Sequence, residues 1–259
     1  MKYHPNYQFA GIIPARYASS RFPGKPLVMI GDRTMIQRVY DQAKKVLDMV
    51  YVATDDERIY KEVERFGGKA IMTLSSHMSG TDRCEEAVTM IVNENNIVPD
   101  VVINIQGDEP FIRPEQINQL KSCFDDPGVS IATLIRKTAK GEDIFNPNQP
   151  KVILDKEGNA LYFSRSVIPF IRDCEPELWS EKHTFYKHIG LYAYKTDTLK
   201  KITVLKRSSL EIAESLEQNR WIENGFRIKT AVTEWESIGI DTPDDLEKVL
   251  KAINNYLNI

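Results

Sequence analysis

Apolar and polar positions along the chain follow a pattern that favours strands alternating with helices. Four short apolar runs have the length of buried strands: 9–13, 49–53, 69–72 and 101–105. Between them, 35–47 and 56–66 carry apolar side chains three and four positions apart, which predicts amphipathic helices. Parallel strands need crossover connections of this length. The pattern therefore predicts an α/β fold with a doubly wound, mostly parallel sheet and helices on both faces.

The second half of the chain predicts further strands, a hairpin and two helices. The strands and the hairpin are expected at 129–134, 188–194, 227–232 and 238–240, and at 152–154 with 160–164. One helix is expected over 210–223, where Glu214 and Gln218, four positions apart, would share a face. The last helix is expected to begin at Pro243, because proline suits the first position of a helix.

Two stretches beside the hairpin are less regular. The polar connection 137–150 predicts a flexible insertion or the edge of a subdomain. The segment 169–185 has no clear period, and its aromatic residues suit either a dimer contact or an ordinary core. We therefore expect one domain over residues 1–259, with a small excursion formed by the hairpin.

Composition narrows the class of protein. A length of 259 residues with 42% hydrophobic residues is enough for a sizeable core. The net charge of -3, from 34 basic and 37 acidic residues, gives no global attraction to nucleic acid or to a membrane surface. We expect neither secretion nor membrane insertion, because the N-terminus lacks an apolar signal region and no apolar run is long enough. Three well-separated cysteines favour free thiols in a reducing cytoplasm and disfavour a zinc site.

A basic loop follows the first strand and is the first candidate for chemistry. Residues 11–27 contain Arg16, Arg21 and Lys25 but no carboxylate, and small residues such as Ala15 would let backbone N–H groups approach a phosphate. A solvated surface loop is the alternative interpretation. The loop is not a Walker A motif, because Pro26 replaces the hydroxyl residue that would hold magnesium.

Polar residues also follow two other predicted strands. Asp55 stands at the end of 49–53, at the edge where open α/β sheets bind ligands. The alternative is that Asp55 or Asp56 caps the next helix, which is the interpretation we favour for Asp56. Asp108 stands in the turn after 101–105, where a magnesium ligand would be expected opposite a phosphate loop, although an ordinary turn explains it equally well.

Two helix starts add further candidates. Thr81 is expected to cap the helix that contains Cys84, which would leave Ser79 and Gly80 free to contact a base or a ribose. Asp241 precedes the cap of the last helix and so has no capping role of its own.

The ordered set of motifs resembles the family of 3-deoxy-manno-octulosonate cytidylyltransferases, also called CMP-KDO synthetases. The resemblance covers nearly the whole chain and rests on the stretches 11–27, 79–83, 104–110, 160–165, 188–190, 209–211 with 216–218, and 239–243. The basic loop is shared with other sugar nucleotidyltransferases. The sequences Ile-Gln-Gly-Asp-Glu-Pro and Tyr-Phe-Ser-Arg, in this order, are more specific.

The resemblance implies a nucleotidyltransferase-like fold and the reaction of CTP with 3-deoxy-manno-octulosonate to give the CMP-sugar and pyrophosphate. It further implies Mg²⁺ as cofactor, a homodimer with the hairpin region as its dimerisation excursion, and a role in lipopolysaccharide synthesis. The residues that it assigns to the triphosphate, with a catalytic role, are Arg16 and Lys25. Those assigned to cytidine or sugar are Ala15, Ser79, Gly80, Arg83 and Gln106. Asp108 and Asp241 would bind magnesium, Asp108 also acting in catalysis, and Arg165, His188, Glu214 and Gln218 would face the sugar acid.

Three alternatives remain at this stage. A nucleotidyltransferase for another acidic sugar, including the 8-amino analogue, would share much of the pattern. A metal-dependent glycosyltransferase normally carries Asp-x-Asp, which this sequence lacks. A non-catalytic nucleotide-binding module is disfavoured because both aspartates and all three loop cations are present.

Overall fold

The computed structural model describes residues 7–18, 21–236 and 238–257, so that Ser19 and Ser20 of the basic loop lie outside the described residues. These residues form two compact units. Unit I comprises the described residues between 7 and 117 and between 238 and 257, and unit II comprises 118–236. Along the chain, helix α4 (Pro114–Ser122) crosses the boundary. The prediction of one domain over 1–259 stays a prediction.

The strands of unit I form a parallel sheet in the order β6-β1-β4-β5. They are β1 (Phe9–Ala15), β4 (Met49–Thr54), β5 (Ala70–Met72) and β6 (Val101–Asn104). Ala15 pairs with Thr54, and Thr54 with Met72, so three strands end at the same level. All four residues of β6 are buried, as expected for an apolar run in a sheet covered on both faces. Polar residues that follow these strands are thereby brought to one edge.

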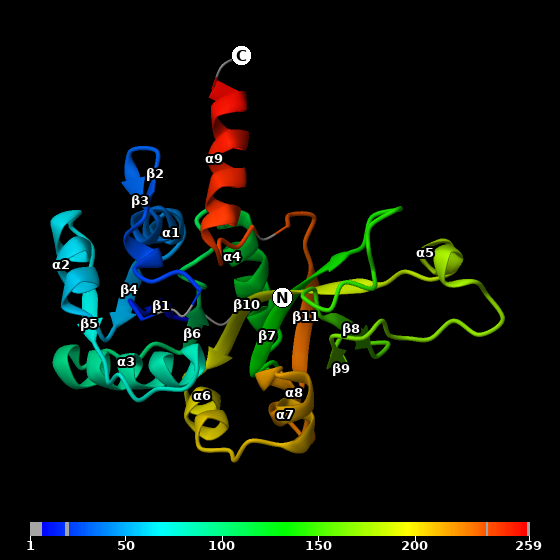
Figure 1. Cartoon of the computed structure of the whole chain (residues 1–259). Coiled ribbons are helices and arrows are strands. Elements are labelled where there is room, and N and C mark those ends of the chain that lie inside the picture. Colours follow the sequence, from blue (N-terminus) through cyan, green and yellow to red (C-terminus); the bar gives the residue numbers. More distant parts are fainter. Residues whose placement is uncertain (1–6, 19–20, 237, 258–259) are drawn as a thin grey trace. The chain divides into compact units, whose positions relative to one another are not determined.

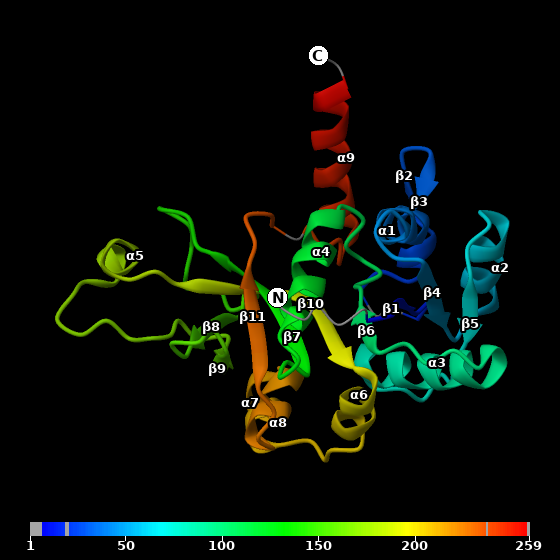
Figure 2. The ribbon, with the colours of Figure 1, turned by 180° about the vertical axis from the view of Figure 1, so that it is seen from behind.

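Helices cover both faces of this sheet (Figures 1 and 2). Helices α1 (Met35–Lys44) and α2 (Glu57–Arg65) pack on one face, and α3 (Gly80–Asn95) packs on the other. Asp56 caps α2 by accepting a hydrogen bond from the Arg58 backbone N–H, because its carboxylate satisfies a donor that has no partner within the helix. The predicted α/β class, with strands and helices alternating around a mostly parallel sheet, is confirmed.

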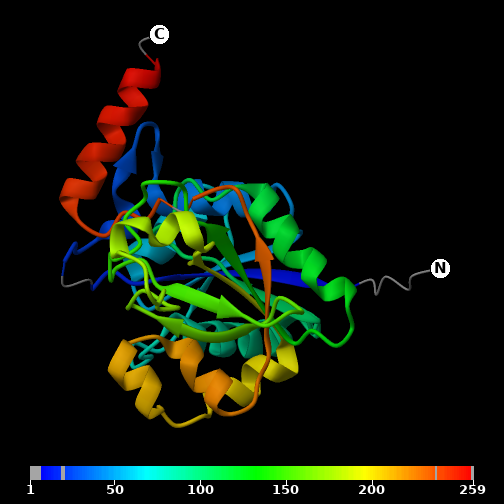
Figure 3. The same ribbon diagram turned by 90° about the vertical axis from the view of Figure 1, so that its right-hand side faces the viewer.

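The last helix, α9 (Pro243–Leu257), returns to unit I and packs beside a small hairpin (Figure 3). The hairpin consists of β2 (Met29–Ile30) and β3 (Arg33–Thr34), and a 3₁₀ turn, η1 (Lys25–Leu27), precedes it. Ile30 and Ile240 are fully buried in the cluster that Leu246 and Val249 of α9 complete. This packing fixes the chain just before α9, where Asp241 lies.

The strands of unit II include both parallel and antiparallel pairs. They are β7 (Ile131–Lys137), β8 (Lys151–Leu154), β9 (Ala160–Ser164), β10 (Tyr186–Lys195) and β11 (Ile228–Val232). The order β11-β7-β10 joins a parallel and an antiparallel pair, and β8 pairs antiparallel with both β10 and β9. The predicted hairpin is therefore confirmed as β8–β9.

Short helices complete unit II. They are η2 (Cys123–Asp125), η3 (Pro176–Leu178), α5 (Trp179–Lys182), α6 (Thr196–Thr203), α7 (Ser209–Glu214) and α8 (Glu217–Glu223). The segment that carries α5 extends away from β7 and β10 of the same unit (Figure 1). Trp179 packs there in a small core with Ile144 and Phe185, whereas Phe170 is 74% exposed.

Three predictions about elements were wrong. Residues 238–240 form no strand. The helix expected over 210–223 is broken at Ser215, which has a φ of 50° and ends α7 in the left-handed conformation. Glu214 and Gln218 consequently lie on different helices rather than on one face. Ser79, not Thr81, caps α3 by accepting from the Asp82 backbone N–H at 3.1 Å.

Two further features concern membrane spans and cysteines. No helix within the described ranges is both long and apolar enough to cross a lipid bilayer. The three cysteines are free thiols, as expected, and Cys84 is buried.

Candidate active site

A cavity of about 340 Å³ opens in unit I at the carboxyl ends of β1 and β6. Five residues assigned to nucleotide or metal line it: Ala15, Arg16, Lys25, Gln106 and Asp108. Arg21 also lines the cavity. Because the edge of a parallel sheet at the carboxyl ends of its strands is where α/β proteins bind ligands, this cavity is the candidate active site.

Lys25 lies at the centre of a charge cluster beside the cavity. Its Nζ donates to Asp108 Oδ2 at 2.7 Å and to Asp241 Oδ1 at 3.0 Å, although the two aspartates are 133 positions apart. The Lys25 side chain is only 13% exposed. Burial lowers its pKa, but the two carboxylates outweigh burial and raise the pKa above its ordinary value. Lys25 is therefore a fixed ammonium ion.

Backbone contacts bring Asp241 to this place. The Ile240 N–H donates to the carbonyl oxygen of Asp108 at 3.0 Å, which joins the segment before α9 to the turn after β6. Thr242 and Asp245 cap α9 reciprocally, since the Asp245 N–H donates to Thr242 Oγ1 and the Thr242 N–H to Asp245 Oδ2. The Asp241 carboxylate takes no part in the cap and instead contacts Lys25, and Arg21 at 3.3 Å.

Gly107 allows the turn after β6 to approach β1 closely. A Cβ atom on Gly107 would stand 2.7 Å from the backbone oxygen of Pro14, closer than two such atoms can approach. Any other residue would therefore push the Asp108 turn away from the end of β1.

Arg16 and the start of α3 form a second group in unit I. Arg16 Nη2 donates to the backbone oxygen of His77, and burial together with the neighbouring positive charge of Arg83 lowers the pKa of Arg16. Arg83 is fully buried, and donates to Asp55 Oδ2 at 2.9 Å and to Thr73 Oγ1. Its guanidinium therefore holds the ends of β4 and β5.

Ser79 and Gly80 lie at the N-terminus of α3, close to this edge. A Cβ on Gly80 would stand 3.5 Å from Pro14 Cγ, and Pro14 lines the cavity. Ser79 accepts the capping hydrogen bond, but its hydroxyl proton remains available for donation. Both residues, with Arg83 behind them, are placed close to the cavity but outside its lining.

The residues assigned to the sugar acid lie in unit II, and two of them form a tight pair. Glu214 accepts from Ser164 Oγ at 2.6 Å, from Tyr162 Oη at 3.1 Å and from the Arg165 N–H at 2.9 Å. Burial raises the pKa of Glu214, but these hydrogen bonds outweigh it and lower the pKa below its ordinary value. Glu214 is therefore held as an oriented carboxylate.

Arg165 supports this carboxylate. Its guanidinium donates to three backbone oxygens, those of Glu214 at 2.7 Å, Pro147 at 3.0 Å and Ser215 at 3.4 Å. Lys151 Nζ, almost fully buried, donates to the backbone oxygens of Arg165 at 2.7 Å and Asn146 at 2.9 Å. These contacts pin the end of β9 and the connection before β8 around Glu214.

The other two residues assigned to the sugar acid lie on other elements of unit II, His188 on β10 and Gln218 on α8. The His188 ring packs against Phe163 of β9, with centroids 5.0 Å apart, and its Nε2 is 3.2 Å from Thr133 Oγ1. Burial lowers the pKa of His188 to about 3, so the imidazole is neutral at pH 7. Within the described part of the chain, the buried Nε2 of Gln218 has no hydrogen-bond partner.

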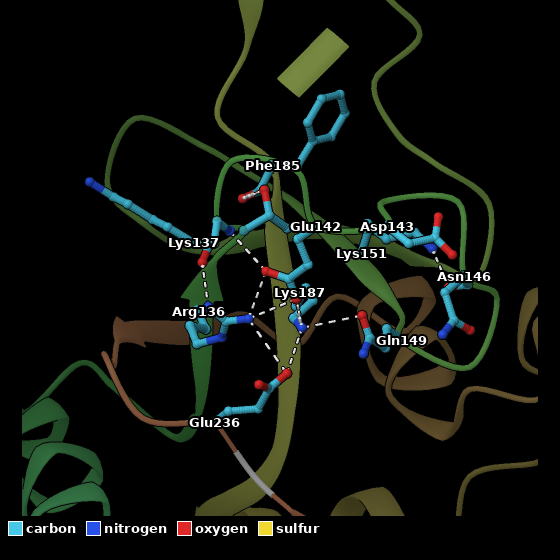
Figure 4. Close-up of polar contacts among 12 residues, drawn as sticks. Arg136, Lys137, Glu142, Asp143, Asn146, Gln149, Lys151, Phe185, Lys187 and Glu236 are labelled. Carbon is cyan, nitrogen blue, oxygen red and sulfur yellow. Dashed lines mark hydrogen bonds and ion pairs between the residues drawn. The ribbon is translucent and has the colours of Figure 1, made fainter. Parts of the chain in front are cut away.

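A second charge cluster in unit II holds the connection 137–150 (Figure 4). Arg136 of β7 and Lys187 of β10 both contact the Glu142 carboxylate, and Lys187 also donates to Glu236 at 2.7 Å. The Lys187 side chain is 5% exposed and that of Glu142 is 18% exposed, so this pair is largely removed from bulk water, whereas Glu236 is 51% exposed. The connection, predicted to be flexible or a subdomain edge, is thus tied to two strands.

Sequence reasoning missed several of these contacts. It gave no role to the ion pair of Asp55 with Arg83, nor to the contact of Arg21 with Asp241. The position of Asp55 after an apolar strand was a usable signal, but its partner lies 28 residues away. Tyr162 and Ser164 were named only as parts of a motif, although both hold Glu214.

Comparison with known proteins identifies the family to which the chain belongs. The profile described as Cytidylyltransferase matches residues 10–231. Proteins named 3-deoxy-manno-octulosonate cytidylyltransferase match along nearly their whole length. The one from Bacteroides thetaiotaomicron is 57% identical over 96% of this chain and 99% of its own, and the one from Parabacteroides distasonis is 57% identical with the same coverage. The chain belongs to this family of cytidylyltransferases.

Solved structures agree with this assignment. A structure of CMP:2-keto-3-deoxy-manno-octonic acid synthetase, complexed with CTP, is 42% identical, has a TM-score of 0.87 and covers 96% of this chain and 99% of its own. The family resemblance and the α/β nucleotidyltransferase fold expected from the sequence are thus confirmed, and the chain is a nucleotidyltransferase.

Proposed function

We propose that this cytidylyltransferase activates 3-deoxy-D-manno-octulosonate with CTP, giving the CMP-sugar and pyrophosphate. Support comes from the relatives, which carry the name of this activity, and from the related structure complexed with CTP. The observation that carries the proposal is the cavity at the ends of β1 and β6, where the basic loop lies beside the Asp108 turn. Cations facing carboxylates at such an edge suit a nucleoside triphosphate with a divalent metal.

The reaction needs little covalent chemistry from the protein. The anomeric hydroxyl of the sugar attacks the α-phosphorus of CTP, a P–O bond forms, and the bond to the pyrophosphate oxygen breaks while the hydroxyl proton is released. Catalysis then depends on positioning and on stabilisation of charge at the leaving group. Arg16 and Lys25 supply positive charge at the cavity for this purpose. The cytidine or sugar region is proposed to consist of Ala15 and Gln106 in the cavity lining, Ser79 and Gly80 beside it, and the buried Arg83 behind them.

Mg²⁺ is proposed as the cofactor, with Asp108 and Asp241 as its ligands. The donor set fits the ion, because two carboxylate oxygens already lie around one cationic atom, Lys25 Nζ, at 2.7 and 3.0 Å. Among the described residues, no group of three or more His, Cys, Asp or Glu side chains is arranged to hold a metal. A protein site with two carboxylates is typical of Mg²⁺, which usually takes its other ligands from phosphates and water. When bound, Mg²⁺ neutralises phosphate charge and polarises the reacting oxygens.

The sugar acid is assigned to Glu214, Arg165, His188 and Gln218. Their contacts within unit II suggest a different role for each of the four residues. Glu214 is an oriented acceptor for sugar hydroxyls, and the buried amide of Gln218 has an unused donor. Arg165 acts by holding Glu214, since its guanidinium already serves three carbonyl oxygens. His188 is neutral, so it would recognise the sugar by hydrogen bonding rather than by charge.

A homodimer is proposed to form through the excursion of unit II. Phe170 is 74% exposed and packs edge-on against Trp179 at 4.9 Å, next to Phe145, which is 47% exposed. Exposed aromatic side chains around a small apolar core suit a protein interface. We also propose that the enzyme works in the cytoplasm, and that its product serves lipopolysaccharide synthesis, as the sugar in the relatives' names implies.

The test is a matrix of pyrophosphate release with Mg²⁺, in which CTP, UTP and ATP are each combined with 3-deoxy-manno-octulosonate, its 8-amino analogue and a sialic acid. Release only with CTP and the first sugar is expected. Pyrophosphate release with another sugar acid would support nucleotidyltransferase activity but would replace 3-deoxy-manno-octulosonate as the proposed substrate. Calorimetric binding of CTP without turnover of any sugar would instead support a regulatory module.

A further inference from the structure

Arg58 on α2 makes a contact with the basic loop that the mechanism above does not use. Its guanidinium carbon lies 3.2 Å from the centre of the Tyr17 ring, so the cation stacks on the ring face. Tyr17 directly follows Arg16 in the loop. Helix α2 also packs against η1, which begins with Lys25. The stack therefore joins the helix to the part of the loop that carries both proposed triphosphate ligands.

Asp56 fixes the guanidinium in this position. Arg58 Nε donates to Asp56 Oδ1 at 2.9 Å and Nη2 donates to Oδ2 at 2.7 Å, a two-pronged contact that sets the plane of the group. The same carboxylate caps α2 through the Arg58 backbone N–H. Arg58 is thus oriented by the helix N-terminus rather than by chance packing of an exposed side chain.

Tyr17 in turn closes the loop on Gly24. The Gly24 N–H donates to the Tyr17 carbonyl oxygen at 2.9 Å, which brings together residues seven apart. Gly24 has a φ of 72°, and a Cβ there would stand 3.2 Å from three atoms of the Tyr17 side chain. The ring thus packs against the glycine that immediately precedes Lys25. Arg16 and Lys25 flank the two ends of this closure.

We propose that Arg58 is a positioning residue for nucleotide binding. By stacking on Tyr17, it holds the Tyr17–Gly24 closure against α2 and so fixes the spacing of Arg16 and Lys25 before CTP arrives. This inference rests on the proposed function, in which those two cations bind the triphosphate. It predicts an effect on CTP binding and not on the sugar acid, because the side-chain contacts of Arg58 in the described part of the chain are with Tyr17 and Asp56.

Arg65 provides a matched control on the same helix. It is also exposed, at 64% against 57% for Arg58, and it also makes a two-pronged contact with a carboxylate, that of Glu62. No stacking of Arg65 on a ring is found within the described residues. Arg65→Ala therefore removes the same charge and the same kind of ion pair from α2, but leaves the loop contact intact.

The experiment measures the Kd for CTP by calorimetry, together with kcat and the KM of each substrate, for the unmodified enzyme, Arg58→Ala, Arg58→Lys and Arg65→Ala. Arg58→Ala is expected to weaken CTP binding and to raise the KM for CTP by about two- to fivefold. This is the change in affinity that corresponds to the loss of one exposed cation–π contact. The KM for the sugar acid should stay unchanged. Arg58→Lys should recover only part of the loss, because an ammonium cannot make the planar stack and the fork together.

A second pair of variants tests the ring. Tyr17→Phe retains the stacking face and should bind CTP as the unmodified enzyme does, whereas Tyr17→Leu should resemble Arg58→Ala. Equal CTP affinity in Arg58→Ala and Arg65→Ala would overturn the inference, as would a parallel rise in both KM values, which indicates a general loss of structure. Absence of CTP binding by the unmodified enzyme would overturn the proposed function itself, and this inference with it.

Discussion

Replacement of Lys25 by alanine should strengthen metal binding but lower the rate of turnover. Its ammonium contacts Asp108 and Asp241, the two proposed metal ligands. A divalent ion held by these carboxylates would compete with the ammonium for them, and the ammonium would then be available to the phosphates. Lys25→Ala should therefore tighten the binding of metal in the absence of nucleotide, yet lower turnover by about 100-fold through loss of charge stabilisation.

The size of the metal effect follows from the contacts. A hydrogen bond between charged groups contributes about 1.5–3 kcal/mol. The Asp241 side chain is 46% exposed, so water screens its contact, and we count only the 2.7 Å contact with Asp108 at about 1.5 kcal/mol. Since 1.4 kcal/mol corresponds to tenfold, Lys25→Ala should bind a divalent metal about tenfold more tightly.

The assay is titration with Mn²⁺ followed by electron paramagnetic resonance, without nucleotide. Arg21→Ala is the control, because Arg21 also contacts Asp241 but is 65% exposed, and it should change the affinity by less than about threefold. Unchanged or weaker Mn²⁺ binding in a folded Lys25→Ala protein would refute the exchange of lysine for metal. Near-normal turnover of that variant would separately remove Lys25 from catalysis.

Three further predictions concern the metal, the pH dependence and the turn. Asp241→Asn should raise the Mg²⁺ concentration needed for half-maximal turnover, and an unchanged titration would return Asp241 to a purely structural role. Because the pKa of His188 is about 3 in the folded protein and about 6.5 when unfolded, unfolding takes up a proton between these values. The contribution of His188 to stability should thus be lost as the pH drops from about 6.5 towards 3, by at most about 1.4 kcal/mol per pH unit. Urea unfolding at a series of pH values should show that the unfolding free energy of His188→Gln depends less steeply on pH. An equal dependence on pH in both proteins would exclude a contribution from His188. Gly107→Ala should lower the melting temperature and destabilise the fold by about 1–3 kcal/mol, because its Cβ meets Pro14; an unchanged melting temperature would show that the turn can move.

Local patterns were sufficient to predict most of the elements. The apolar run 101–105 became the fully buried β6, and Asp56 caps α2 as its position indicates. Errors arose where tertiary contacts override local preference. Ser215 breaks a helix although serine does not normally adopt a positive φ, and 238–240 is held by the Asp108 turn and the α9 cluster instead of forming a strand.

The site could be predicted only in part for a related reason. The cations of the basic loop and Asp108 follow strands, so parallel topology alone brings them to one edge. Asp241 reaches the same place through the Ile240 N–H and the packing of α9, and no periodicity in the sequence reports such long-range contacts. The resemblance to a known family supplied that link. The contact of Arg58 with Asp56 and its stacking on Tyr17 could not be predicted from the sequence, because no local pattern marks Arg58 or Tyr17 as partners.

The most direct measurement is phosphorus NMR of the purified enzyme with CTP, Mg²⁺ and 3-deoxy-manno-octulosonate. The account predicts that the CTP signals disappear while a phosphodiester signal of the CMP-sugar and a pyrophosphate signal grow in equal amounts. Unchanged CTP, or conversion of CTP to CDP and phosphate, would contradict the assignment of this chain as the cytidylyltransferase of that sugar acid.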